Sequence, residues 1–253
     1  SGTRVIDLIP EKDRCNHVIC KVGAVVKELN YQLTDRNDGV EITLLGLDHE
    51  EASKAYETSL RFIIAMAFHR LYPDVRVRFS YNVSRAIFCQ SLTQGFNMSR
   101  ATEPIKQEVA RIIKENLPIT RVTVTKEEAR EIYSKFGHED KLEILEYRPD
   151  TVVHLYKCGE YYDYLHGYMV ASTGAIKTYR IAPYSPGMII QYPRHELDAT
   201  IPKFQEESTY GKTLQTAYQW SKKVGLQTIV GINKKVEESP RDFVQLCEAR
   251  HNH

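Results

Sequence analysis

Apolar positions in the first 48 residues follow the pattern of a small unit built mostly of strands. They alternate with polar residues at 18–20, and a short apolar patch covers 24–29. A second alternating run at 40–44 follows the turn signal Asn37-Asp38-Gly39. Alternation with a period of two is typical of half-buried strands, and Asn, Asp and Gly favour the turns between them.

Helical spacing takes over in the next segment. Apolar residues recur every three or four positions through 49–72, which predicts one helix that ends before Pro73. Asp48 and Glu51 have the spacing of a capping box at its start. Two strands are then expected, at 75–80 and 86–92.

The middle of the chain interleaves both periodicities. Apolar residues from Ile105 to Leu117 predict an amphipathic helix that Thr102 caps and Pro118 ends. A strand at 119–124 follows. It leads into a helix whose capping box is Thr125 and Glu128, with Gly137 placed as a C-cap.

Strand-like residues dominate 151–193, where Gly and Pro punctuate apolar runs that include 176–181 and 188–192. An antiparallel sheet is the natural interpretation. Two further helices are expected, near 214–224 and after Pro240. The order of these elements predicts an α+β fold.

Composition narrows the class of protein. The 253 residues carry 34 Lys and Arg against 33 Asp and Glu, so the net charge is +1 and a globally basic nucleic-acid binder is excluded, whereas a local basic patch is not. No apolar run reaches the roughly 18 residues of a membrane span, and no secretory segment precedes the fold. We therefore expect a cytoplasmic protein with no membrane partner. Its five scattered cysteines fit reduced thiols.

Two candidate motifs each lack a residue that their chemistry needs. Gly211-Lys212-Thr213 ends like a phosphate-binding loop, but Glu206 stands where that loop needs its first glycine, and no strand precedes it. The segment is better explained as the start of a helix. Cys158 and His166 share one strand-like region, but no third group is placed to orient them, so a catalytic thiol pair is the weaker interpretation.

The densest group of chemically active side chains lies between 154 and 168. Tyrosine rings offer stacking surfaces and hydroxyl donors, and an acid and basic groups stand among them, as in many nucleotide sites. The candidate ligand-binding residues here are His154, Lys157, Tyr161, Tyr162, Asp163 and His166. The alternative is a tyrosine-lined sheet with a polar solvent face, and the residues leave both open.

Three segments carry a resemblance to a known family. They are Ala67-Phe-His-Arg-Leu-Tyr-Pro73, 137–145, and the Tyr162-Asp163 strand leading into Gly167. In this order they resemble the second additional domain of threonyl-tRNA synthetases, which is related to the editing domain of alanyl-tRNA synthetases. Residues 17–48 look like a partial TGS domain, a small β-grasp unit. The resemblance implies two domains, a TGS-like unit at 1–48 and an editing-domain-like unit at 49–253.

A branch of this family fused to a kinase is the closer resemblance. Its pattern is similar to 154–163, to Ser172-Thr173-Gly174 and to 182–187. The resemblance implies that a uridine kinase or phosphoribulokinase type domain follows residue 253 and is the partner of this chain. ATP and Mg²⁺ would then belong to that domain, and no cofactor is expected in these residues.

The departures from the synthetase pattern concern the metal. An editing domain of this kind holds its ion with a His-x-x-x-His pair on a helix and with a later Cys and His. The matching places here are Phe62, Met66, Leu165 and Met169. Lys141 and Asp163 match polar positions of the editing site, and Ala86 replaces a glycine of it. The resemblance therefore implies a degenerate site without metal.

These observations predict a tRNA-synthetase-like module of a uridine-kinase-like protein that is not catalytic by itself. It would bind a nucleotide, an RNA or its own kinase domain around Asp163, with Lys141 among the nearby residues. One alternative is a metal-independent hydrolase of mischarged aminoacyl-tRNA that uses Lys141 and Asp163. Another is a structural module that orients or oligomerises the kinase.

Overall fold

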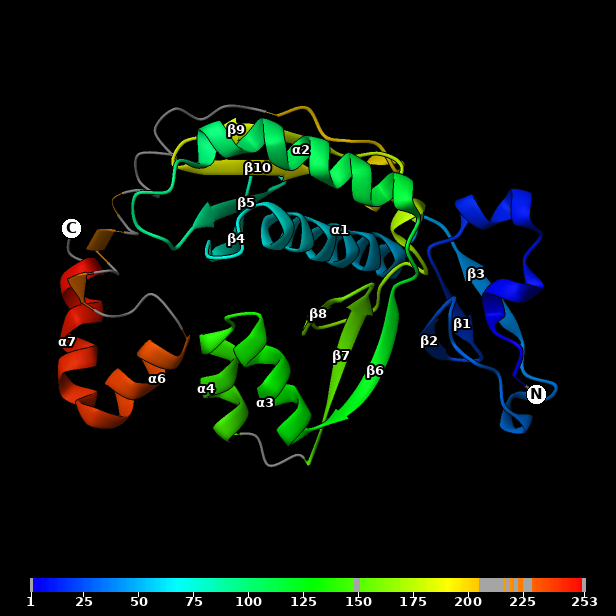
Figure 1. Ribbon diagram of the computed structural model, residues 1–253, viewed down its shortest axis with the longest axis horizontal. Coiled ribbons are helices and arrows are strands. Elements are labelled where there is room, and N and C mark those ends of the chain that lie inside the picture. The colour runs from blue at the N-terminus through cyan, green and yellow to red at the C-terminus, as the bar shows by residue number, and fades with distance from the viewer. Residues whose placement is uncertain are drawn as a thin grey trace. The chain divides into compact units, whose positions relative to one another are not determined.

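The computed structural model describes residues 2–147, 151–204, 216, 219–220, 223–224 and 229–251. Within them the chain forms an α+β fold with antiparallel sheets, as the interleaved patterns predict (Figure 1). Two compact units are present: Ser1–Thr125 with Val152–Glu206, and Lys126–Thr151 with Glu207–His253. The expected division at residues 48 and 49 concerns family relationship and stays a prediction.

The N-terminal β unit is a three-stranded sheet of order β2-β1-β3, as the alternating pattern predicts. Its strands are β1 (Ile19–Val22), β2 (Val25–Glu28) and β3 (Ile42–Leu45). Short 3-10 turns at Val5–Leu8 and Glu11–Asn16 precede β1, and another at Asp35–Asn37 lies between β2 and β3. Such turns are too short to show a repeating apolar pattern, so the sequence did not indicate them.

Helix α1 (Glu50–Leu71) is buried on most sides, because it lies between two sheets (Figure 1). It ends at Leu71, with Tyr72 as its C-cap, and so stops before Pro73 as predicted. The predicted capping box is wrong. His49 is the N-cap, and its ring Nδ1 accepts the backbone N–H of Glu51 at 3.3 Å, so the cap lies one residue beyond Asp48.

The second sheet has the order β4-β5-β10-β9. Its strands are β4 (Val77–Val83), β5 (Ala86–Ser91), β9 (Arg180–Tyr184) and β10 (Gly187–Gln191). A Cβ atom on Gly187 would lie 2.1 Å from the carbonyl oxygen of Cys89, so the close approach of β10 to β5 requires glycine.

The predicted strand at 176–181 forms only from Arg180 onward. The backbone N–H groups of Lys177 and Thr178 both donate to the hydroxyl of Tyr56 on α1, each at 2.9 Å. These two residues therefore bond to a helix side chain in place of a neighbouring strand. An apolar pattern cannot reveal such a side-chain partner.

Helix α2 (Met98–Glu115) lies along β9 and β10 (Figure 1). The predicted cap Thr102 is wrong, because Asn97 caps the helix through the N–H of Arg100 at 3.0 Å. Thr102 lies one turn inside, where its hydroxyl donates to the carbonyl of Met98 at 2.9 Å. The helix therefore starts at Met98, about two turns before the apolar run that begins at Ile105.

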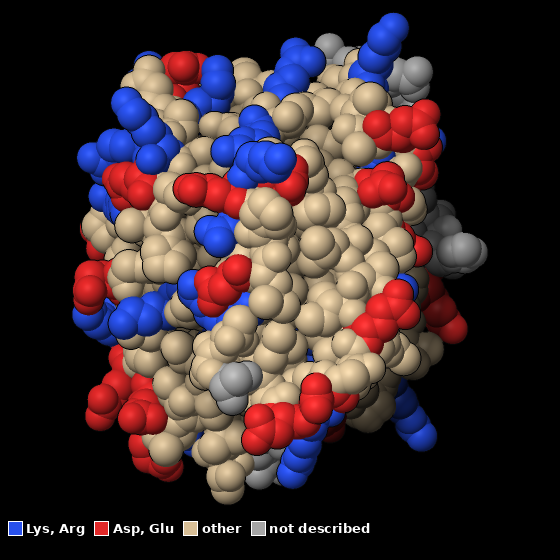
Figure 2. Space-filling view, turned by 90° about the vertical axis from the view of Figure 1, so that its right-hand side faces the viewer, with Lys and Arg blue, Asp and Glu red and all other residues tan. Residues whose placement is uncertain are grey.

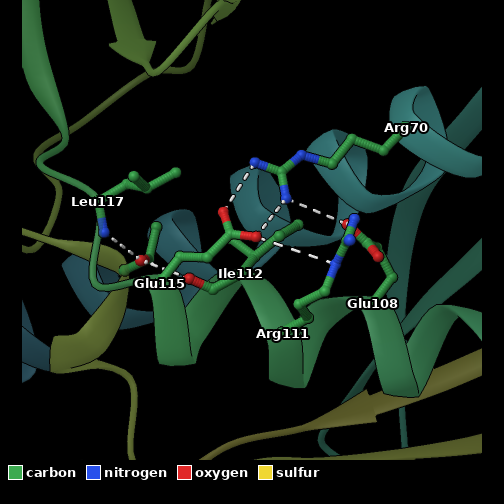
Figure 3. A network of polar contacts seen from close by, with 7 residues as sticks. Arg70, Glu108, Arg111, Ile112, Glu115 and Leu117 are labelled. Carbon is green, nitrogen blue, oxygen red and sulfur yellow. Dashed lines mark hydrogen bonds and ion pairs between the residues drawn. The ribbon is translucent and has the colours of Figure 1, made fainter.

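Ion pairs fasten α2 to α1 (Figure 3). The guanidinium of Arg70 on α1 contacts Glu108 at 3.1 Å and Glu115 at 3.0 Å, and Arg111 contacts Glu108 at 2.8 Å. Glu108 is 6% exposed. A carboxylate so deeply buried requires such partners. The network holds the end of α1 that reaches toward the third sheet.

The third sheet has the order β6-β7-β8, with β6 (Thr120–Thr125), β7 (Val152–Cys158) and β8 (Tyr161–Asp163). The prediction that the strands within 151–193 form one antiparallel sheet is therefore wrong. β7 and β8 pair with β6, whereas β9 and β10 pair with β5. Local pattern indicates strands but not which distant strand each one joins.

The other compact unit is helical where it is described. Its helices are α3 (Lys126–Lys135), α4 (Glu139–Tyr147), α6 (Ile229–Glu238) and α7 (Pro240–His251). Gly137 follows α3 with φ +66°, as expected of a C-cap glycine, and α7 begins at Pro240 as predicted. The helix expected near 214–224 lies largely outside the described residues. No described helix combines the length and apolar character needed to cross a membrane.

Candidate functional site

Strand register divides the predicted site residues between two faces of the third sheet. Tyr156 lies opposite Asp163, and Cys158 lies opposite Tyr161. Opposed residues share a face, and so do alternate residues of one strand. His154, Tyr161 and Asp163 therefore share one face. We call it the α1 face, because the Tyr161 ring contacts Phe62 of α1 at 5.2 Å between centroids.

Asp163 is the buried acid of the α1 face, with 5% of its surface exposed. Its Oδ1 accepts the backbone N–H of Tyr164 at 2.7 Å, and its Oδ2 accepts the hydroxyl of Tyr161 at 3.2 Å. Burial and the nearby carboxylate raise the pKa of Tyr161 well above its usual value, so this hydroxyl stays protonated as a donor. Asp163 is thus held as a fixed acceptor beneath the surface.

His69 is a neighbour of this group that the sequence analysis missed. Its ring lies 5.5 Å from that of Tyr161, and the residue is half-buried. Phe62, Met66 and His69 occupy positions i, i+4 and i+7 of α1, which places them on one stripe of the helix. The sequence could have indicated His69, because its spacing from Phe62 places both residues on the same side of a helix.

The four residues that the resemblance matches to metal ligands are packing residues of the interior or its edge. Phe62, Met66 and Met169 are buried, and Leu165 is half-buried. A structural or catalytic zinc ion needs thiolate, imidazole or carboxylate donors, so these four side chains do not fit one. Across the described residues, no cluster of three or more His, Cys, Asp and Glu could hold a metal ion. Ala86, which the resemblance matches to a glycine, is buried in β5.

The exposed part of the α1 face carries two basic side chains. Arg121 and Thr123 on β6 lie opposite Tyr156 and His154, and Arg121, Thr123 and His154 are all exposed. The hydroxyl of Thr123 lies 2.9 Å from Nδ1 of His154. This contact holds the ring of the exposed His154 through Nδ1 and does not use Nε2. His154 and Asp163 are diagonal neighbours across the strands, about 7–8 Å apart.

Lys157, Tyr162 and His166 do not lie on the α1 face of the strands. Lys157 and Tyr162 occupy the opposite face of the sheet, where the ammonium lies 5.3 Å from the ring centroid. His166 is exposed in the turn after β8. Lys141 belongs to α4 of the other compact unit. Residues adjacent in sequence are thus separated because successive strand residues point to opposite faces.

The two discarded motif candidates differ in how far the structure describes them. Burial raises the pKa of Cys158 to about 11, which keeps the thiol protonated and disfavours its use as a nucleophile. Residues 210–213, which include the Gly-Lys-Thr sequence, lie outside the described residues.

Hydrogen bonds join the N-terminal β unit to the α1 face. The carboxylate of Glu28 accepts the hydroxyl of Tyr156 and the backbone N–H of Met169, the latter at 3.3 Å. The amide of Asn30 donates to the carbonyls of Ile119 and Ala171 at 2.9 and 2.8 Å. Burial raises the pKa of Glu28 above its usual value.

Comparison with known proteins identifies threonine–tRNA ligases as relatives. The chain is 32% identical to the ligase of Listeria welshimeri over 167 residues, which is 64% of this chain and 26% of that protein. It is 33% identical to the ligase of Thermotoga maritima over 172 residues, and 30% to that of Anoxybacillus flavithermus over 166. The matched region spans about a quarter of the length of these relatives. No protein-family model matches the chain.

Proposed function

We propose that this chain is a tRNA-binding module of the threonyl-tRNA synthetase type that has lost the metal-dependent chemistry of an editing site. The observation that carries the proposal is the composition of the α1 face. Asp163, Tyr161 and His69 form an ordered polar floor, and Arg121 and His154 are exposed on the same face. The metal positions of the resembled domain are apolar here. The relatives act on tRNA, as their name states, which supports the choice of ligand.

The two exposed basic residues would contact the RNA directly. Arg121 can pair with a phosphate in a bidentate manner, and the Nε2 atom of His154 can donate to or accept from a ribose hydroxyl. Asp163 and Tyr161 would act indirectly, by fixing β8 beneath that surface. On the face seen in Figure 2, lysines and arginines alternate with acids. Because the net charge of the chain is only +1, binding would rest on local contacts and not on one continuous basic field.

The proposal also includes the kinase domain that the resemblance implies. We propose that the chain precedes a uridine-kinase-like domain, which would be its partner and would alone bind ATP and Mg²⁺. This part rests on the resemblance of 154–163, 172–174 and 182–187. The ligases reported above lend it no support. Sequencing the natural transcript past residue 253 tests it, and a stop codon there would contradict it.

The binding test uses fluorescence anisotropy with a labelled threonine tRNA transcript over a range of salt concentrations. Arg121→Ala should weaken binding and lower the slope of log K against log salt by about one, because one phosphate contact is lost. His154→Ala should weaken binding with less effect on the slope. The matched controls Lys157→Ala and Tyr162→Phe, on the opposite face, should bind as the unmodified chain does.

Hydrolysis separates this proposal from its main rival. Mischarged seryl-tRNA incubated with the chain and a chelator should lose its amino acid no faster than in buffer. Faster loss that Asp163→Asn abolishes would make the chain a metal-independent hydrolase. Failure to bind tRNA, or equal effects of substitutions on both faces of the sheet, would favour a purely structural module.

A further inference from the structure

A cavity of about 630 Å³ opens in the N-terminal β unit, apart from the α1 face. Its apolar wall consists of Val22, Val25 and the ring of Tyr31. Val25 is 52% exposed, so this part of the wall is open to a ligand. The volume lies in the range of sites that hold small organic ligands, and it is far larger than an inorganic anion needs. We call it the N-terminal pocket.

Hydrogen bonds fix the orientation of Asn37 in this pocket. Its Oδ1 accepts the backbone N–H of Thr34 at 3.0 Å, the Thr34 hydroxyl at 3.1 Å and the Tyr31 hydroxyl at 3.5 Å. Because a backbone N–H can only donate, the atom facing it must be the oxygen. The side-chain NH₂ group is therefore turned away from these partners. Within the described residues it makes no hydrogen bond, so two donors remain available.

Two cations complete the polar wall. The ammonium of Lys27 lies 4.8 Å from the centroid of the Tyr31 ring, and Arg36 is exposed beside the pocket. Neither forms an ion pair with a carboxylate in the part of the chain that the structure describes. Asp35 supplies one negative charge to the lining, so cations outnumber acids. The donors of Lys27, Arg36 and Asn37 outnumber this single carboxylate, which favours an anionic ligand group.

We propose that the N-terminal pocket binds a nucleoside phosphate. The phosphate would be held by Lys27, Arg36 and the amide of Asn37, and the base would lie on the apolar wall of Val22, Val25 and Tyr31. An anionic head joined to a flat, weakly polar body matches this division of the lining. The site is distinct from the proposed tRNA surface, so either proposal can fail without the other.

Isothermal titration calorimetry at constant ionic strength tests the ligand class. AMP or UMP should bind at least about tenfold more tightly than adenosine, uridine or inorganic phosphate, since each of those lacks one half of the contacts. Equal binding of inorganic phosphate would reduce the pocket to an anion site and overturn the proposal. Absence of binding by both nucleotides would also overturn it.

Variants test the placement. Lys27→Met and Arg36→Gln should each weaken nucleotide binding about tenfold, because each removes a charge-assisted contact. Asp35→Asn should tighten it, since a repelling charge is lost. Lys21→Met, a change of the same type on β1 outside the lining, is the matched control and should have no effect. All four variants should still bind tRNA. Unchanged nucleotide affinity in both Lys27→Met and Arg36→Gln would place the ligand elsewhere.

Discussion

The α1 face of β7 and β8 and the N-terminal pocket both gather polar side chains, but these side chains find their partners in different places. On the α1 face, Asp163 accepts two hydrogen bonds from its own strand and the following residue, and the ring of Tyr161 packs on α1. In the pocket, Lys27 and Arg36 have no carboxylate partner among the described residues, and the amide of Asn37 keeps its donors.

This difference separates stability from binding. Polar groups that satisfy one another inside the protein contribute to the folded state, so their loss should appear as a change in unfolding free energy. Donors that face an open cavity contribute little to folding but can pair with a ligand. The first region should therefore respond to substitution by unfolding more easily, and the second by losing affinity at nearly constant stability.

Asp163→Ala should give the largest loss of unfolding free energy. The buried hydroxyl of Tyr161 and the N–H of Tyr164 lose their acceptor, which we expect to cost about 2–3 kcal/mol of unfolding free energy. Tyr161→Phe removes only the hydroxyl and keeps the ring contacts with Phe62 and His69, so it should cost about 1 kcal/mol. Urea denaturation followed by circular dichroism measures both.

The pocket supplies the control for that experiment. Arg36→Gln changes an exposed side chain without an ion pair and should shift the unfolding free energy by less than about 0.5 kcal/mol. If Arg36→Gln proves as destabilising as Asp163→Ala, the pocket cations are part of the folded framework. The contrast between the two regions would then be lost.

Substitution of Glu28 should change the unfolding free energy by a smaller amount, and this change should depend on pH. It follows Lys27 of the pocket and accepts hydrogen bonds from Tyr156 and Met169, so it lies where the two regions meet. Burial raises its pKa in the folded state, although the contacts with Tyr156 and Met169 and the charges of Arg121 and Lys27 oppose this. The folded state thus binds the proton more tightly than the unfolded chain does.

The direction in which the unfolding free energy changes with pH follows from this difference in proton affinity. The stabilising contribution of protonated Glu28 is fully present below the unfolded pKa, near 4.5, and is lost as the pH rises through the higher folded value. Unfolding free energies measured from pH 4 to pH 7 should therefore fall for the unmodified chain relative to Glu28→Gln. A rise relative to the variant would mean that Tyr156, Arg121 and Lys27 outweigh burial.

Much of the fold could be predicted from the sequence because its signals are local. The period of apolar residues in 49–72 and the stop at Pro73 locate α1 to within a residue at each end. The hydrogen-bond partners of a segment, in contrast, can lie far away in the sequence. Residues 176–181 have a strand-like pattern, but Lys177 and Thr178 bond to Tyr56, more than a hundred residues earlier in the chain.

The candidate site shows the same limit at the level of side chains. Sequence indicated Tyr161 and Asp163, because an acid among tyrosines is a local feature. It could not separate Lys157 and Tyr162 from them, since the face on which a residue lies depends on strand register. His69 and the N-terminal pocket escaped for a related reason: their significance comes from neighbours that only folding supplies, such as the Tyr161 ring beside His69.

Cysteine labelling offers the smallest but most local measurement of the contrast. Cys20 in β1 and Cys158 in β7 are both buried, and burial raises the pKa of each thiol to about 11. At pH 8 about one in a thousand of such thiols is ionised, so labelling of either residue requires local opening. The exposed residues Cys15 and Cys247 should react first. Mass spectrometry can follow each site separately.

A nucleoside phosphate bound in the pocket at ten times its dissociation constant should slow labelling of Cys20 about tenfold, because it stabilises only the closed form. Cys158 should be unaffected. Equal slowing at both cysteines would show that the two regions open together, and unchanged labelling of Cys20 would remove the ligand from the pocket.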